Sequence, residues 1–145
     1  LRPIQIAGAK VAIWEAGNAG RLTNLIDESI LADEVVAGAR TTSFVSAAFP
    51  VERPDAEQTA IRCATVAATE EEVEYGVSVA VELTPGDTED RAHGIVGIAL
   101  VHPEGVAHRR HEITAPPHEV RRRATMWAAD FLWSTLRETT RRHPE

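Results

Sequence analysis

Cysteine and lysine are almost absent from this sequence of 145 residues, which contains only Cys63 and Lys10. A single cysteine excludes an intramolecular disulfide and a multi-cysteine zinc site, and it favours a reducing compartment. We therefore expect a cytoplasmic protein. Free cysteine usually behaves as a small buried hydrophobe, so we interpret Cys63 as a core residue of a helix rather than as a nucleophile.

Long apolar runs and an excess of positive charge are also missing. No stretch approaches the roughly 18 apolar residues that cross a bilayer, and the first residues lack the basic-then-apolar order of a secretory signal. The net charge is -7 at pH 7, whereas nucleic-acid binding needs a basic field. These absences argue against a membrane or a nucleic acid as the main partner. Arginines nevertheless cluster in the last quarter of the chain, where a local anion site is conceivable.

The composition, 43% hydrophobic and 26% charged, is that of a globular protein. A chain of this length fits one ordinary domain, and no internal repeat divides it. We therefore expect residues 1–145 to form a single α/β domain.

Apolar runs predict strands and helical spacing predicts helices. The expected strands are 10–14, 35–45 with Gly38 inside it, 75–83, 94–101 and 106–113, the last two joined as a hairpin. The expected helices are one with the face Leu22, Leu25, Ile26 and Ser29, one from a cap at Asp55 to about 69, and one from 117 to about 139. The three most apolar strands, 10–14, 75–83 and 94–101, should form the centre of a mixed sheet with helices on both faces. The expected fold is a three-layer α/β/α sandwich.

The turn Glu-Ala-Gly-Asn-Ala-Gly at residues 15–20 joins a buried strand to a helix. Such a turn can gather backbone N–H groups at a helix N-terminus, where they attract a phosphate or an oxyanion. It does not match the glycine pattern of dinucleotide-binding folds or of the P-loop. An ordinary strand-to-helix connection is the alternative.

The sequence gives little support for a metal site or for a catalytic triad. His108 and His111 are three apart on an expected strand, so their side chains should point to opposite faces and cannot share a metal. The acidic run at residues 70–74 is typical of a solvated helix end, and no Gly-x-Ser-x-Gly turn presents a nucleophile. We predict neither a metal site nor a cofactor.

Several segments, in this order, resemble the C-terminal domain of the competence-damage-inducible protein A (CinA) family. The strand Val-Ala-Ile-Trp leading into residues 15–20 resembles the family strand that ends in Glu-Ser-Cys-Thr-Gly-Gly. The segments 55–68 and 75–86 resemble a family helix, strand and Gly-Pro loop. The end, GIVGIALVHPEGVAHRRHEI followed by VRRRATMWAADFLWSTL, resembles the family's final hairpin and arginine-rich helix. The resemblance implies the family's α/β fold and, for its stand-alone members, deamidation of nicotinamide mononucleotide.

The residues on which that chemistry depends differ here. The family's nucleophilic serine falls on Ala16, and its activating lysine, from Tyr-Ser-Asn-Glu-Ala-Lys, falls near Ala47. A family threonine of the third strand falls on Ala80 or a neighbour. Lys10, the only lysine, lies six residues before Ala16 on an extended strand, roughly 20 Å away. A serine–lysine amidase cannot be assembled from these residues.

We therefore expect a catalytically degenerate relative that is either a binder of a small, nucleotide-type molecule or a structural subunit. The expected ligand-binding residues are Glu15, Gly17, Asn18, Gly20, Arg121 and Arg122. The alternative is a nicotinamide-mononucleotide amidohydrolase with a relocated nucleophile, Ser43 or Ser46. We also expect a homo-oligomer, because Trp127 and Trp133 are six apart on the last helix and should not both reach one sheet.

Overall fold

The computed structural model describes residues 10–29, 36–52, 54–88 and 90–142. Within them the elements are β1 (Val11–Ala16), α1 (Arg21–Ser29), β2 (Val36–Thr42), α3 (Phe44–Ala48), α4 (Ala56–Glu70), β3 (Tyr75–Pro85), β4 (Ala92–His102), β5 (Gly105–Ala115) and α5 (Pro117–Arg142). None of the described helices is both long enough and apolar enough to cross a membrane.

The five strands form one sheet in the order β2-β1-β3-β4-β5. β1 pairs in parallel with both β2 and β3, whereas β3–β4 and β4–β5 are antiparallel. The mixed sheet and its three central strands are as the sequence predicts, and the polar β5 lies at an edge. The expected hairpin of β4 and β5 is confirmed.

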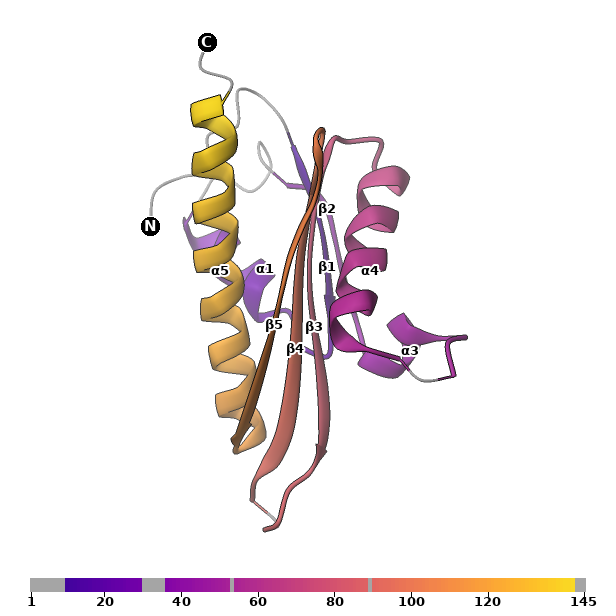
Figure 1. Ribbon diagram of the computed structural model, residues 1–145, viewed down its shortest axis with the longest axis vertical. Helices are drawn as coiled ribbons and strands as arrows, with labels where there is room; N and C mark the ends of the chain where they lie inside the picture. Colours follow the sequence, from indigo (N-terminus) through magenta and orange to yellow (C-terminus); the bar gives the residue numbers. More distant parts are fainter. Residues whose placement is uncertain (1–9, 30–35, 53, 89, 143–145) are drawn as a thin grey trace.

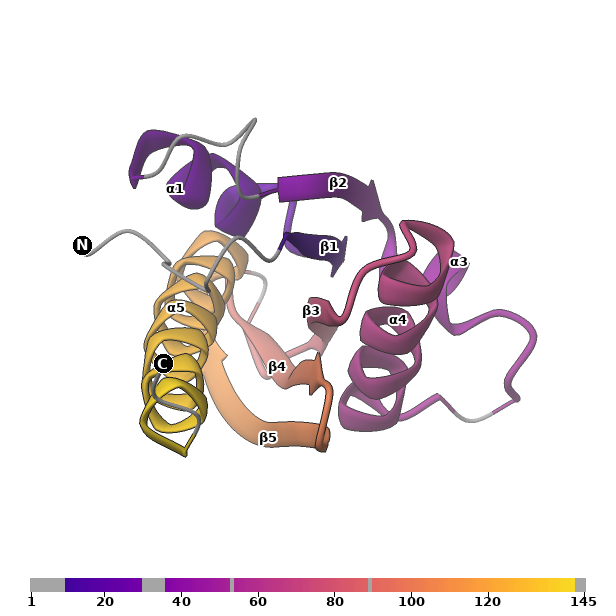
Figure 2. The ribbon, with the colours of Figure 1, turned by 90° about the horizontal axis from the view of Figure 1, so that it is seen from above.

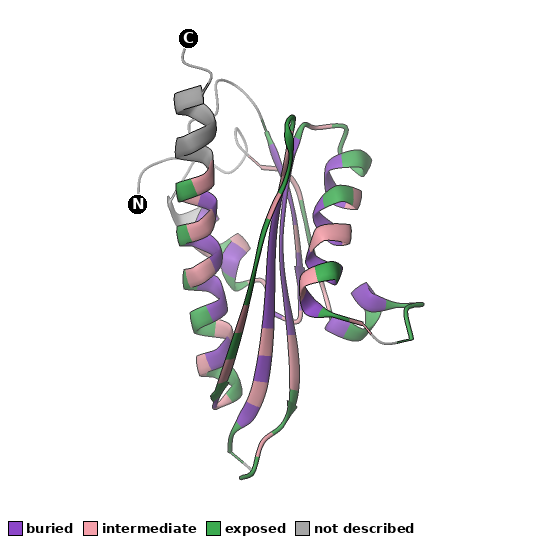
Figure 3. Cartoon of the chain, in the orientation of Figure 1, coloured by how far each residue is buried: buried purple, intermediate pink, exposed green. Residues whose placement is uncertain are grey.

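Helices cover both faces of this sheet, as Figures 1 and 2 show: α1 and α5 lie on one side, α4 and α3 on the other. The side chains of a strand alternate between the two faces. On β1, Val11 and Ile13 therefore join the branched residues under α1 and α5, and Ala16 joins an alanine-rich cluster under α4 and α3. Figure 3 shows the buried residues concentrated in the central strands and on the inward sides of α4 and α5.

The helix α4 packs closely on the sheet because its inner face is built from small residues. Ala56, Ala60, Cys63, Ala64 and Ala67 are all buried, as their spacing predicts. The cap at Asp55 is confirmed, since its carboxylate accepts hydrogen bonds from the backbone N–H groups of residues 57 and 58.

The expected strand 35–45 is wrong at its C-terminal end. β2 ends at Thr42, and Phe44 and Val45 belong to the short helix α3. The Ser43 hydroxyl caps this helix by accepting a hydrogen bond from the backbone N–H of Ser46. Phe44, Ala47 and Ala48 are buried on one side of α3. Burial at this helical spacing therefore outweighs the preference of Phe and Val for strands. Val35 lies outside the described residues.

The two tryptophans of α5 are covered within the fold, contrary to the expectation that they mark an oligomer interface. Trp127 and Trp133 are both partly buried, and both pack against the cluster under α1 and α5. Trp127 also stacks on His111 of β5, with ring centroids 4.3 Å apart. The helix α5 contacts α1 as well as β3, β4 and β5, so it has more than one neighbour against which its side chains can pack. The oligomeric state itself stays a prediction.

Candidate functional site

The candidate site is a groove at the carboxyl ends of the parallel strands. From β1 the chain goes first to β2 on one side and later to β3 on the other. In open α/β sheets, ligands bind where the order of strands reverses in this way. A groove of about 380 Å³ is found there, within the usual range of small-molecule sites. Its lining residues are Gly17, Ala19, Thr42, Ser43, Phe44, Val45, Val81, Leu83 and Arg121.

Behind the groove, Glu15 is fully buried and holds the start of α1. Its Oε1 accepts hydrogen bonds from the backbone N–H of Leu22 (2.8 Å) and from Asn18 Nδ2 (2.9 Å). Its Oε2 accepts from the backbone N–H and the hydroxyl of Thr23, at 2.8 and 2.5 Å. A carboxylate at a helix N-terminus satisfies free N–H groups and interacts favourably with the helix dipole. Both oxygens of Glu15 are therefore engaged within the fold.

Asn18 links this cap to α5, 107 residues further along the chain. Besides the bond to Glu15, its Nδ2 donates to Thr125 Oγ1 at 3.0 Å, and the Thr125 hydroxyl donates to the Arg121 carbonyl. Asn18 Oδ1 is buried and has no hydrogen-bond partner within the described part of the chain. Thr125 was not among the residues expected from the sequence. Its position beside the small residues Ala124 and Ala128 of the last helix could have indicated a buried hydroxyl.

Gly17 is required at its position for two reasons. Its φ of +79° is strained for any residue with a side chain, and an added Cβ would lie 2.4 Å from the carbonyl oxygen of Val81. The turn after β1 therefore lies directly against β3, at one side of the groove.

Of the two arginines expected to bind a ligand, only Arg121 lines the groove. Its Nε donates to the carbonyl oxygen of Gly17 at 3.1 Å, and its terminal NH₂ groups have no hydrogen-bond partner among the described residues. Arg122 instead pairs with Glu119 on the exposed side of α5 and lines a separate surface hollow. The structure thus brings Gly17 and Arg121 together, leaves Glu15 and Asn18 buried behind them, and places Gly20 and Arg122 outside the groove lining.

The positions that the family resemblance relates to catalysis lie together in an apolar environment. Ala16 and Ala80 are paired residues of β1 and β3, and both are fully buried. Ala47 of α3 belongs to the same packed cluster. Lys10 precedes β1, at the opposite end of the strand from Ala16. No hydroxyl or amine therefore stands at any of the three positions.

The alternative nucleophiles, Ser43 and Ser46, are exposed at the start of α3. Ser43 Oγ donates to Ser46 Oγ at 2.9 Å and accepts from the backbone N–H of Ser46 at 3.1 Å. Among the described residues, no imidazole, carboxylate or amine is hydrogen-bonded to either hydroxyl. Within this part of the chain, neither serine therefore has a hydrogen-bonded general base.

Other candidate groups are structural. Cys63 is buried in α4, and burial raises the pKa of its thiol to about 11, so the reactive thiolate is suppressed. His108 pairs with Glu57 of α4 at 2.6 Å, whereas His111 stacks on α5, so the two histidines do face opposite ways. In the described ranges, no group of three or more His, Cys, Asp or Glu side chains is arranged to hold a metal.

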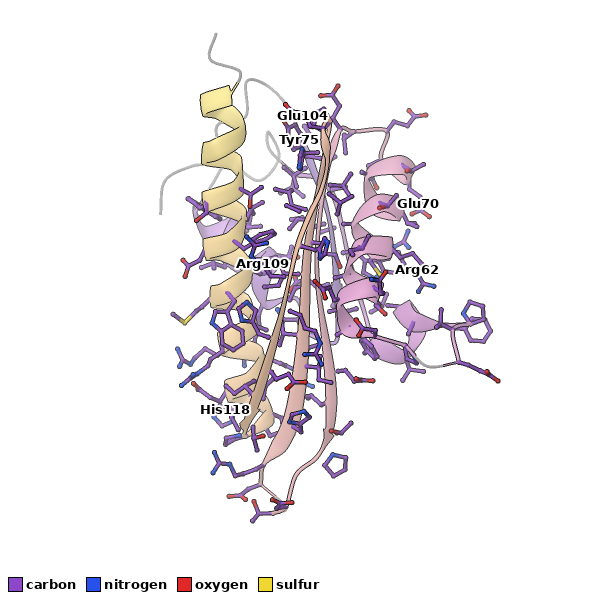
Figure 4. All side chains as sticks on the ribbon, in the orientation of Figure 1. Arg62, Glu70, Tyr75, Glu104, Arg109 and His118 are labelled. Carbon is purple, nitrogen blue, oxygen red and sulfur yellow. The ribbon has the colours of Figure 1, made fainter. Side chains whose placement is uncertain are left out.

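The two ends of the sheet differ in character. In Figure 4, Tyr75 and Glu104 lie at the end opposite to the start of α5, where His118 is labelled. Burial, helped by Glu74 and Glu104, raises the pKa of the Tyr75 hydroxyl. This end thus presents a neutral phenol beside acidic side chains, whereas Arg121 lines the groove at the other end.

Comparisons with known proteins agree with this fold. No family model matches the sequence. A CinA-like protein of Thermomicrobium roseum is 35% identical over 136 residues, which are 92% of this chain and 32% of that protein. The chain therefore spans about a third of the length of the curated relative that it matches.

Solved structures of the CinA superfamily share the fold at low sequence identity. The protein from Enterobacter cloacae has a TM-score of 0.73 at 17% identity, covering 90% of this chain and 83% of that one. A competence/damage-inducible protein from Agrobacterium tumefaciens has a TM-score of 0.67 at 19% identity, covering 88% and 85%. The chain is thus a CinA-like homologue with the α/β fold of the CinA superfamily.

Proposed function

We propose that this chain is a catalytically degenerate CinA-like domain that binds a small, nucleotide-type molecule in the groove. The observation that supports the proposal is one buried cluster of alanines beside the groove: by the family resemblance the nucleophile falls on Ala16, the lysine near Ala47 and the threonine on Ala80 or a neighbour. Nucleophilic attack on an amide needs an oxygen or sulfur and a base that activates it. Neither stands at these positions.

Binding, in contrast, needs only the parts that remain. Gly17 gives the turn after β1 its positive φ, and Arg121 brings two NH₂ groups to the groove that have no hydrogen-bond partner among the described residues. A guanidinium can bind a phosphate through two parallel hydrogen bonds. The buried Glu15–Asn18–Thr125 network holds the turn and α5 in register, so these groups are positioned before a ligand arrives.

The second candidate is an amidohydrolase that uses Ser43 or Ser46. Ser43 lines the groove, which is the single observation in its favour. Among the described residues its hydroxyl is hydrogen-bonded to Ser46 alone, so this reaction would need a base supplied by the substrate or by water.

Ammonia release from nicotinamide mononucleotide separates the two. We expect no turnover by the native chain above a control without protein, and none by Ala16→Ser, because a restored hydroxyl without a base stays inactive. Removal of one member of a catalytic group already costs about a millionfold in well-studied hydrolases. Turnover by the native chain that is lost in Ser43→Ala or Ser46→Ala would establish the enzyme instead.

Thermal unfolding with pyridine mononucleotides then separates a binder from a structural subunit. A ligand at 100 times its dissociation constant should add about 2.7 kcal/mol to the free energy of unfolding. Arg121→Gln should remove that gain, whereas Arg122→Gln should keep it, since Arg122 lies outside the groove lining. No stabilisation by any mononucleotide would favour the structural subunit.

The proposal also covers the cellular location of the protein and the partners that it binds. A single, buried cysteine supports a reducing, cytoplasmic setting, and the net charge of -7 disfavours nucleic acid. A homo-oligomer is now supported by the exposed apolar side chains Val45, Phe49 and Val51, which are 77%, 76% and 52% exposed. A monomeric mass by light scattering at high protein concentration would refute it.

A further inference from the structure

Thr42, the last residue of β2, lines the groove, and its hydroxyl is only partly used within the fold. The indole N–H of Trp14 donates to Thr42 Oγ1 at 2.9 Å. Since an indole nitrogen can only donate, it occupies a lone pair of this oxygen and leaves the hydroxyl proton available. Among the described residues, no acceptor is hydrogen-bonded to that proton. The Thr42 hydroxyl can therefore donate to a molecule in the groove.

The neighbouring hydroxyl of Ser43 also lines the groove, but it belongs to the cap of α3. It donates to Ser46 Oγ at 2.9 Å and accepts from the backbone N–H of Ser46 at 3.1 Å. The cap thus uses this hydroxyl both as a donor and as an acceptor. Of the two hydroxyls in the groove lining, only that of Thr42 has a proton without an acceptor in the described part of the chain.

Two hydrogen bonds through Gly17 place Thr42 near Arg121. The backbone N–H of Gly17 donates to the Thr42 carbonyl oxygen at 2.8 Å, and the Gly17 carbonyl oxygen accepts from Arg121 Nε at 3.1 Å. The end of β2, the turn after β1 and the start of α5 are therefore joined side by side at the groove. Because Nε is engaged by Gly17, the donors that Arg121 retains for a ligand are its two terminal NH₂ groups.

These donors match the chemistry of a phosphate. Arg121 is the only ionisable side chain among the described lining residues, so no carboxylate of the lining repels an anion. A guanidinium can bind two phosphate oxygens through parallel hydrogen bonds. A phosphate monoester has three strongly accepting oxygens, so it can also accept from a hydroxyl beside the guanidinium.

We propose that Thr42 is a ligand-binding residue whose hydroxyl donates to the same phosphate group that Arg121 binds. This inference rests on the proposed binding function and deepens it, because it names a phosphate monoester as the anionic group of the ligand and Thr42 as a second residue that binds it. The hydrogen bond from Trp14 sets the direction of this donor, since the hydroxyl proton must point away from the indole N–H.

Mononucleotides and the nucleosides that lack their phosphate test this assignment. The probes are nicotinamide mononucleotide with nicotinamide riboside, and adenosine monophosphate with adenosine, because two bases separate the effect of the phosphate from that of the base. Within a pair, calorimetry on the native chain should show tighter binding of the mononucleotide. Arg121→Gln should remove this preference.

The hydroxyl of Thr42 is tested by removing it and by retaining it. In Thr42→Val, mononucleotide binding should weaken roughly tenfold, the usual effect of losing one hydrogen bond to a charged group, and nucleoside binding should stay unchanged. Thr42→Ser keeps the hydroxyl and should bind mononucleotides as the native chain does. Thr41→Val is the matched control, because Thr41 precedes Thr42 on β2, is exposed and is absent from the groove lining. It should keep the native affinities.

The possible failures can be told apart. If mononucleotides bind in a manner that depends on Arg121 but bind folded Thr42→Val as tightly as the native chain, the role of Thr42 is overturned and the binding function stands. Equal weakening of mononucleotide and nucleoside would also overturn it, because the hydroxyl would then not act on the phosphate. If no mononucleotide binds the native chain, both proposals are overturned. Should Thr42→Val not fold, Thr42→Ala replaces it, since the smaller side chain leaves room for a water to accept from the Trp14 indole.

Discussion

Substitution of Glu15 by glutamine tests whether the turn at the groove depends on a buried carboxylate. Glutamine has nearly the same shape, but one of its two terminal groups is a donor. If its oxygen replaces Oε1, it still accepts from Asn18 Nδ2 and the Leu22 N–H. The NH₂ group then faces the backbone N–H of Thr23, which loses its acceptor.

The cost follows from the groups left unpaired. A buried donor without a partner costs about 1–3 kcal/mol, and hydrogen bonds to a charged group contribute more than those to a neutral one. The Thr23 hydroxyl can rotate and accept from the new NH₂ group, which recovers part of the loss. We therefore expect Glu15→Gln to lower the free energy of unfolding by about 2–3 kcal/mol. For a chain of this size, that corresponds to a fall of roughly 4–12 °C in melting temperature.

Urea denaturation, followed by far-UV circular dichroism, measures this change. Glu52→Gln is the matched control: Glu52 is exposed in the loop before α4, so its substitution should stay within about 0.5 kcal/mol of the native chain. Equal stability of the Glu15→Gln variant and the control would refute the view that this carboxylate holds the turn and the start of α1.

Three further predictions concern the rest of the fold. Burial, and secondarily the charge of Arg109, lowers the pKa of His111, so the folded state favours the neutral ring. The urea midpoint of unfolding should therefore rise with pH up to about 6.5, the ordinary pKa of histidine. This part of the rise should be absent in His111→Gln. Gly97→Ala should destabilise the fold by about 3 kcal/mol or more in the same assay, because its Cβ would lie 2.1 Å from the Ala56 carbonyl oxygen and main chain must move. Cys63 should react with a chromogenic disulfide reagent only as fast as the chain unfolds, since it is buried and its pKa is about 11; rapid reaction of the native chain would contradict this.

Local patterns in the sequence were enough to predict most of the elements. The apolar runs of β3 and β4, the small-residue face of α4 and the cap at Asp55 each depend on neighbours within a few residues, where periodicity and capping chemistry act. The α/β order followed from these elements, and the CinA-like resemblance came from the sequence segments that are similar to that family; both are upheld. The alanine at position 16 was also visible directly, because a missing hydroxyl needs no tertiary structure to be recognised.

Only the tertiary structure decided which polar residues face the groove. Glu15 and Asn18 look like ligand-binding residues in a turn, yet the start of α1 and Thr125 of α5 engage them. Arg121 and Arg122 are neighbours in sequence, but successive residues of a helix point about 100° apart, and contact with Gly17, 104 residues away, selects Arg121. Phe44 is similar: its helical position depends on burial against β1 and β3. Contacts between distant segments carry no local sequence signal, so they had to come from the fold.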